Sequence, residues 1–182
     1  IDLRLNTPFE GLKTDGELAV LTKDGAIGAD LAVIALGVAP DTALAREAGL
    51  ELGMKGSIVT DAHMRTSDPD IYAAGDAVEV RHFVTGEKTL IALAGPANKQ
   101  GRIAADNICG VGSEYRGSQG SSVIKVFSLT AANTGLNEKA ARAAGLDYEK
   151  VILSPADHAT YYPGARLMTM KVLFERGSRR IL

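Results

Sequence analysis

The chain has 182 residues, 46% of them hydrophobic and 23% charged, with a formal net charge of −2. This composition predicts one or two folded domains with a sizeable core. The only dense basic cluster, Arg176, Arg179 and Arg180, lies at the end of the chain, so we expect neither a nucleic-acid groove nor binding to an anionic membrane surface. No apolar run approaches the roughly 20 residues that span a bilayer. The single cysteine, Cys109, excludes an internal disulfide and favours a reducing, cytoplasmic compartment.

The first 36 residues have the pattern of β-strands. Two short apolar runs, at 18–21 and 31–36, lie on either side of Asp24-Gly25, a dipeptide typical of hairpin turns. The second run is apolar throughout, which predicts a strand covered on both faces of an α/β sheet. Residues 37–40 then end this run, either as a simple strand-to-helix turn or as a boundary between domains, and we place a boundary near Gly37.

The start of the chain and its glycine spacing suggest a piece of a longer protein. The sequence begins at Ile1, without methionine, in what reads as a strand already under way. It contains no Gly-x-Gly-x-x-Gly, the turn with which dinucleotide-binding domains hold a pyrophosphate. We therefore expect any nucleotide-binding loops to precede Ile1.

The segment 66–76 contains the first candidate site. Asp68-Pro69-Asp70 predicts a turn, and residues 71–74 form an apolar run of strand length. The predicted strand ends on Gly75-Asp76, where glycine lets a ligand approach closely and the carboxylate suits a sugar-like hydroxyl. From these residues alone, a plain turn after a strand is the alternative.

A helix is predicted to begin at Gly95-Pro96 and to end at Gly110. Its unpaired N–H groups and the positive end of its dipole favour an anionic partner. Lys99 either faces that partner or is a solvated lysine on the helix surface. Cys109 has no neighbouring histidine or cysteine, so we expect a small buried hydrophobe there and not a catalytic thiol.

A glycine- and serine-rich linker at 113–121 precedes a new pattern. This pattern predicts a small α+β domain over 122–182, with strands at 123–127, 151–153 and 167–174 and a helix capped by Asn137.

Tyr161 and Tyr162 precede Pro163-Gly164 in a loop of that domain. A rigid turn can hold a phenol where its hydroxyl donates a hydrogen bond to a developing thiolate or oxyanion. The alternative is that both rings simply pack and their hydroxyls touch solvent. The histidines at 63, 82 and 158 have no spacing typical of metal ligands, so we expect no metal site.

Three segments together resemble the FAD-dependent pyridine nucleotide-disulfide oxidoreductases: residues 33–40, 66–76 and 93–102. The resemblance covers essentially the whole chain, but only the C-terminal part of such an enzyme. The Tyr-Tyr-Pro-Gly segment at 161–164 is similar to that of the coenzyme A-disulfide reductase and NADH oxidase branch. In that branch a tyrosine of one subunit faces the active site of the other.

The resemblance implies a fold that combines α/β with α+β: the tail of nucleotide-binding sheet domains followed by a small α+β dimerisation domain. Residues 1–37 would be the C-terminal strands of the NAD(P)-binding domain, 38–112 the C-terminal part of the FAD-binding domain, 113–121 a linker and 122–182 the domain that forms a homodimer. The implied contacts with FAD are Gly75, Asp76, Ala94, Gly95, Pro96 and Ala97, and either Tyr161 or Tyr162 would act catalytically across the dimer.

The resemblance also implies an activity for the intact enzyme. NAD(P)H would reduce FAD, and FAD would reduce the disulfide or persulfide of a coenzyme A-type or other small thiol substrate. We expect the chain by itself to be inactive and to bind FAD weakly or not at all, because the nucleotide loops and the redox cysteine belong upstream. Two alternatives are an NADH oxidase of the same superfamily and a non-catalytic dimerisation module with a vestigial flavin motif.

Overall fold

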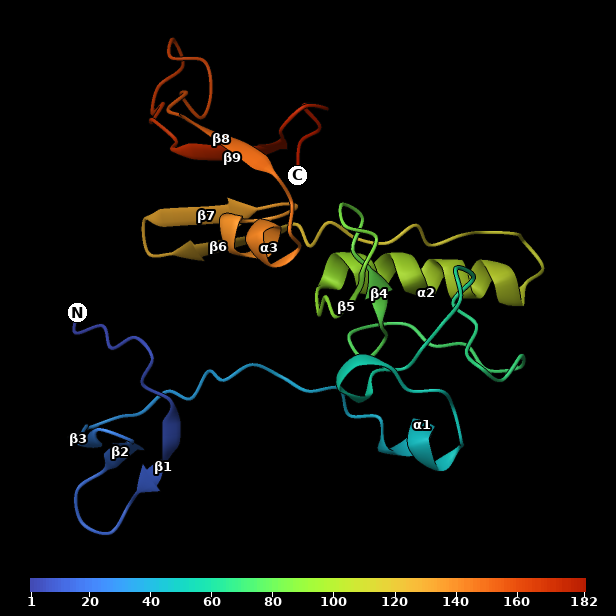
Figure 1. Cartoon of the computed structure of the whole chain (residues 1–182), viewed down its shortest axis with the longest axis horizontal. Coiled ribbons are helices and arrows are strands. Elements are labelled where there is room, and N and C mark those ends of the chain that lie inside the picture. The colour runs from blue at the N-terminus through green and yellow to red at the C-terminus, as the bar shows by residue number, and fades with distance from the viewer. The chain divides into compact units, whose positions relative to one another are not determined.

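The structure, a computed structural model, describes all 182 residues, and the chain divides into two units, Ile1–Val38 and Ala39–Leu182. Figure 1 shows their helices and strands. The first unit has one antiparallel sheet in the order β1-β2-β3, formed by β1 (Phe9–Lys13), β2 (Ala19–Thr22) and β3 (Gly25–Gly28).

The hairpin between β2 and β3 confirms the predicted turn and corrects its partner strand. Thr22 pairs with Gly25 across a two-residue loop. Gly25 has a φ of 123°, which glycine adopts without steric cost. The strand after the turn is therefore Gly25–Gly28 and not the apolar run at 31–36.

The apolar run at 31–36 is not a strand, so the prediction of a buried central strand is wrong. Leu31, Val33 and Leu36 are 75%, 82% and 71% exposed. A strand needs a neighbour that bonds its N–H and C=O groups, and the sheet of this unit contains only β1, β2 and β3. The run therefore lies in an irregular, exposed segment.

The longest helix, α2 (Ala94–Ile108), lies in the first half of the second unit. Smaller elements precede it: α1 (Ala43–Glu47), the 3-10 helix η1 (Met54–Gly56), and the paired strands β4 (Val80–Arg81) and β5 (Lys88–Thr89). Met64 and Val78 are buried with Ala104 of α2, and this cluster joins the helix to the segment that precedes β4.

Helix α2 begins one residue before the predicted start, and Gly110 ends it as predicted. Leu93 is its N-cap, and Gly110, with a φ of 77°, follows the C-cap Cys109. Glycine is favoured there because the chain leaves the helix in a left-handed conformation. With 15 residues α2 is the longest helix, and none of the helices has the length and apolar character needed to cross a membrane.

The second half of this unit consists of two hairpins and a helix: β6 (Ser122–Val126), β7 (Leu129–Asn133), α3 (Glu138–Ala143), β8 (Tyr148–Leu153) and β9 (Met170–Glu175). Strands β6 and β7 form one antiparallel pair, and β8 and β9 form another. The Asn137 side chain accepts a hydrogen bond from the Ala140 N–H at 2.9 Å, which confirms the predicted cap of α3. The core contains Leu136, Ala141, Leu173 and Leu182, and the mixed α/β and α+β fold class is confirmed.

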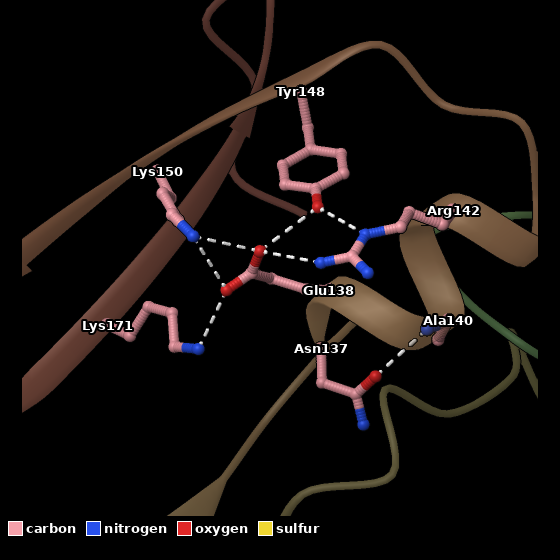
Figure 2. Close-up of polar contacts among 7 residues, drawn as sticks. All are labelled: Asn137, Glu138, Ala140, Arg142, Tyr148, Lys150 and Lys171. Carbon is pink, nitrogen blue, oxygen red and sulfur yellow. Dashed lines mark hydrogen bonds and ion pairs between the residues drawn. The ribbon is translucent and has the colours of Figure 1, made fainter.

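Helix α3 is fastened to the last two strands by one carboxylate, as Figure 2 shows. Glu138 accepts hydrogen bonds from Lys171 Nζ at 2.9 Å and from Lys150 Nζ at 3.0 and 3.1 Å. The Arg142 guanidinium and the Tyr148 hydroxyl each donate to it at 3.1 Å. Lys150 belongs to β8 and Lys171 to β9, so these five residues, the Glu138 cluster, connect the helix to both strands.

The Glu138 cluster predicts how acid affects stability. Hydrogen bonds from Lys171 and Lys150 lower the pKa of the Glu138 carboxyl from its usual 4.5 to about 2. Because the folded pKa is depressed, the ionised carboxylate stabilises the fold above pH 4.5, and this contribution is lost as the pH falls from 4.5 to about 2. We expect the urea midpoint of the wild type to approach that of Glu138→Gln over this range. A difference between the two proteins that is constant with pH would contradict the prediction.

Gly135 packs against the last residue of the chain. Its φ is 68°, and a Cβ there would lie 2.8 Å from the carbonyl carbon of Leu182. Gly145 has nearly the same φ, 66°, but no atom within 4 Å of its Cβ position. We expect Gly135→Ala to lower the free energy of unfolding by about 2 kcal/mol and Gly145→Ala by about 1 kcal/mol. Equal losses in urea unfolding would show that the contact with Leu182 carries no cost.

Candidate functional site

The turn at Gly75 is formed by local backbone hydrogen bonds and not by a strand end. The Val78 N–H donates to the Gly75 carbonyl at 3.1 Å, and Gly75 has a φ of 105°. The predicted strand at 71–74 is wrong, because only Tyr72 forms a bridge, with Arg65, and no parallel strand lies beside this run. The turn nevertheless leaves the Asp76 side chain exposed.

A buried glutamine connects this turn to α2. Gln100 is 0% exposed, and its Oε1 accepts a hydrogen bond from the Gly75 N–H at 2.8 Å. Gln100 lies five residues after Gly95, or about 7.5 Å along the axis of an α-helix. The structure thus brings the Gly75-Asp76 turn to the first half of the helix that the sequence singled out.

The start of α2 has no side-chain cap. Leu93 occupies the N-cap position and makes no capping hydrogen bond, so the N–H groups of Ala94 and Gly95 have no side-chain acceptor. Ala94 and Gly95 are exposed, and Pro96 and Ala97 are half-buried. An uncapped, accessible helix N-terminus attracts negative charge, which fits the anionic partner expected there.

A shallow hollow of about 390 Å³ lies beside this helix start, a volume within the range of small-molecule sites. Lys99 and Arg116 bring positive charge to it, so Lys99 faces an open space next to the helix start. Asp76 does not line this hollow. The full lining is Phe83, Gly95, Pro96, Lys99, Tyr115, Arg116, Gly117, Ser118, Gln119 and Ser121.

Two buried polar atoms behind the helix start lack a hydrogen-bond partner: Gln100 Nε2 and the Tyr115 hydroxyl. Burial raises the pKa of the Tyr115 phenol above its usual value. Neither residue is among the candidates that the sequence predicts. A polar glutamine four positions before the buried Ala104, on the same face of α2, is the signal that could have identified Gln100.

The segment at 113–121 is bonded to earlier residues of the same unit. The Asn107 side chain donates to the Ser113 carbonyl at 2.8 Å, and the Tyr115 N–H donates to the Ala62 carbonyl at 2.7 Å. Ser118 forms a parallel bridge with His82. These bonds hold the segment in place beside α2, where it forms one wall of the hollow.

Tyr161 and Tyr162 lie in the loop between β8 and β9. Their ring centroids are 4.7 Å apart, and the residues are 81% and 59% exposed. Asp157 Oδ1 lies 3.0 Å from His158 Nδ1 in the same loop. Within this chain the two phenols therefore face solvent, and their predicted role across a dimer stays a prediction.

The other candidate residues have simple environments. His63 Nδ1 lies 2.9 Å from the Ser113 carbonyl oxygen, and no group of three potential metal ligands is present among the 182 residues. Cys109 is exposed, so the expectation of a buried cysteine is wrong. It terminates α2 at the surface.

Comparison with known proteins identifies the family. A family model described as "Pyridine nucleotide-disulphide oxidoreductase" matches residues 1–101. The chain therefore belongs to the pyridine nucleotide-disulphide oxidoreductase family. Its relatives include coenzyme A-dependent enzymes and NADH oxidases, which confirms the predicted branch.

Three relatives define this branch. The chain is 37% identical over 163 residues to the "NAD(P)H sulfur oxidoreductase (CoA-dependent)" of Pyrococcus furiosus, covering 90% of this chain and 37% of that protein. It is 34% identical to the "NADH oxidase" of Methanocaldococcus jannaschii over 98% of this chain and 40% of that protein. The structure of reduced Bacillus anthracis CoADR-RHD is 45% identical with a TM-score of 0.88, over 96% of this chain and 32% of that chain. The chain thus spans between 32% and 40% of the length of these relatives.

Proposed function

We propose that this chain is the C-terminal part of a flavoenzyme in which NAD(P)H reduces FAD and the electrons pass to a disulfide or persulfide of coenzyme A type. The observation that carries the proposal is the hydrogen bond from the Gly75 N–H to Gln100 Oε1. This hydrogen bond holds the turn that carries the Asp76 carboxylate next to the uncapped start of α2. Membership of the family supports the same conclusion.

The residues present fit a flavin. Ideal Cβ positions at Gly75 and Gly95 meet no atom within 4 Å, so a ligand has open space at both glycines. The exposed Asp76 carboxylate would accept a hydrogen bond from a ribityl hydroxyl. The N–H groups of Ala94 and Gly95 would face the pyrimidine ring, with Pro96 and Ala97 beside it. FAD would supply hydride acceptance from NAD(P)H, and the N–H groups at the start of α2 would stabilise the negative charge of its reduced form.

The proposed domain assignment follows the predicted ranges. Residues 1–37 would come from the NAD(P)-binding domain and 38–112 from the FAD-binding domain; the division of the chain after Val38 supports this boundary. Residues 113–121 would link them to 122–182, which would pair two subunits as a homodimer. Exposed apolar side chains in that last segment, among them Val123, Phe127 and Leu129, support a protein partner there.

The electron acceptor separates two candidate activities. The name of the Pyrococcus relative and the Tyr-Tyr-Pro-Gly loop favour a coenzyme A-type substrate, which Tyr161 or Tyr162 of a second subunit would approach. The name of the Methanocaldococcus relative, "NADH oxidase", favours oxygen as the electron acceptor.

We expect an enzyme of full family length that contains this chain to oxidise NAD(P)H without oxygen when coenzyme A disulfide or persulfide is supplied. The measurement is the anaerobic loss of NAD(P)H absorbance with and without that substrate. Oxidation that requires oxygen would favour the oxidase. A protein that dimerises but neither binds FAD nor oxidises NAD(P)H would instead be a non-catalytic dimerisation module.

A further inference from the structure

The loop that contains the two tyrosines begins and ends on paired strands. Strand pairing between β8 and β9 ends at Leu153 and Met170, and residues 154–169 between them are named the tyrosine loop. Hydrogen bonds continue into it: the Met168 N–H donates to the Pro155 carbonyl at 2.8 Å, and the Asp157 N–H donates to the Arg166 carbonyl at 2.9 Å. The path of the loop therefore depends on how the two strands approach each other at its base.

The apolar core contacts the β8–β9 hairpin only at the end that is distant from the tyrosine loop. Leu173, which pairs with Lys150, is 5% exposed and packs with Ala141 of α3. Toward the loop the packing weakens, because Leu153 is 45% exposed and Met170 is 37% exposed. Apolar burial is therefore insufficient to fix the last strand pairs before the loop.

The Glu138 cluster lies where that packing ends. Lys171 pairs with Ile152, one position before the base of the loop. Lys150 and Ile152 lie on the same face of β8, because side chains alternate along a strand, so the two ammonium groups are close neighbours of like charge. Glu138 accepts hydrogen bonds from both ammonium groups, at 2.9 to 3.1 Å, and its side chain is only 16% exposed.

We propose that Glu138 is a positioning residue that closes the base of the tyrosine loop and so sets where Tyr161 and Tyr162 lie. Arg142 of α3 and Tyr148 at the start of β8 also donate hydrogen bonds to the carboxylate, so Glu138 is held in place on the helix between the two lysines. Without the carboxylate, the two lysines would repel each other at the last strand pairs. This inference rests on the proposed function, in which one of the two tyrosines reaches the partner's active site.

The first test measures the loop itself, by hydrogen exchange of the amides in 154–169. We expect Glu138→Gln to raise their exchange rates roughly 10-fold, because the strand ends open more often. Lys171→Gln, which leaves Lys150 on the carboxylate, should give a smaller increase. Glu149→Gln is the matched control: Glu149 lies on β8 next to Lys150 and binds Arg176 at 3.0 Å, away from the loop. Unchanged exchange in folded Glu138→Gln would overturn the proposal.

The second test uses an enzyme of full family length that contains this chain. We expect Glu138→Gln to lower kcat for disulfide reduction several-fold with little change in KM for NAD(P)H, and Glu149→Gln to leave both unchanged. Increased loop exchange with an unchanged kcat would overturn the role of the tyrosines in the proposed function. It would leave the positioning of the loop by Glu138 intact, so the two failures are distinguishable.

Discussion

Replacing Gln100 by alanine is expected to lower the free energy of unfolding by about 3 kcal/mol. Gln100 is 0% exposed and supplies the acceptor for the Gly75 N–H at 2.8 Å. The substitution leaves that N–H without its partner, which costs about 1–3 kcal/mol. It also opens a cavity between α2 and the turn, which adds to the loss. Urea unfolding measures the sum.

Two further variants separate these contributions. Gln100→Met keeps most of the side-chain volume but removes the acceptor, so we expect a loss of about 1–2 kcal/mol from the hydrogen bond alone. Gln119→Ala is the control, because the Gln119 side chain is exposed and makes only a 3.4 Å contact with Thr134. It should change stability by less than about 0.5 kcal/mol. If Gln100→Ala resembled this control, the link between the turn and the helix would be of no energetic importance.

The second large effect concerns flavin retention. In an enzyme of full family length that contains this chain, we expect Asp76→Ala to weaken FAD binding about 10- to 100-fold. This factor corresponds to the binding free energy that one hydrogen bond to a charged group contributes. The measurement is the dissociation constant of FAD, from the recovery of visible flavin absorbance during titration of the apoenzyme.

Asp70→Ala provides the matched control for Asp76→Ala. Asp70 is an exposed carboxylate of the same segment, and its backbone N–H bonds to the Asp68 side chain. Its substitution should leave FAD binding unchanged. Equal affinities in the two variants would exclude Asp76 as a ribityl anchor.

The elements that sequence analysis predicted correctly depend on local signals. The Asn137 cap of α3 and the Gly110 end of α2 are set by residues within one helical turn. The turn between β2 and β3, though not the strand after it, depends on a two-residue loop. In each case the residues that decide the structure are neighbours in the sequence, so their pattern is sufficient.

Two of the incorrect predictions concern strands. The runs at 31–36 and 71–74 have strand-like composition, but a strand forms only where a second segment supplies hydrogen-bond partners. The sheets of this chain are small and antiparallel, and neither run belongs to one. Hydrophobicity alone therefore indicated buried strands where the structure has an exposed segment at 31–36 and an irregular, partly buried one at 71–74.

The candidate site was predicted in part. The residues singled out the Gly75-Asp76 turn and the start of α2, and only the family resemblance, not the residues themselves, connected the two. That connection is made by Gln100, a single buried polar side chain 25 residues from Gly75. The Glu138 cluster was missed for the same reason: Lys171 lies 33 residues from Glu138, and no sequence pattern relates two surface-type charges at that distance.

The most direct test of the account is a crystal structure, with FAD bound, of an enzyme of full family length that contains this chain. The account predicts the Asp76 carboxylate at hydrogen-bond distance, about 3 Å, from a ribityl hydroxyl. It also predicts the N–H groups at the start of α2 facing the pyrimidine ring of the same flavin. A flavin bound elsewhere, or an Asp76 that contacts only protein, would contradict it.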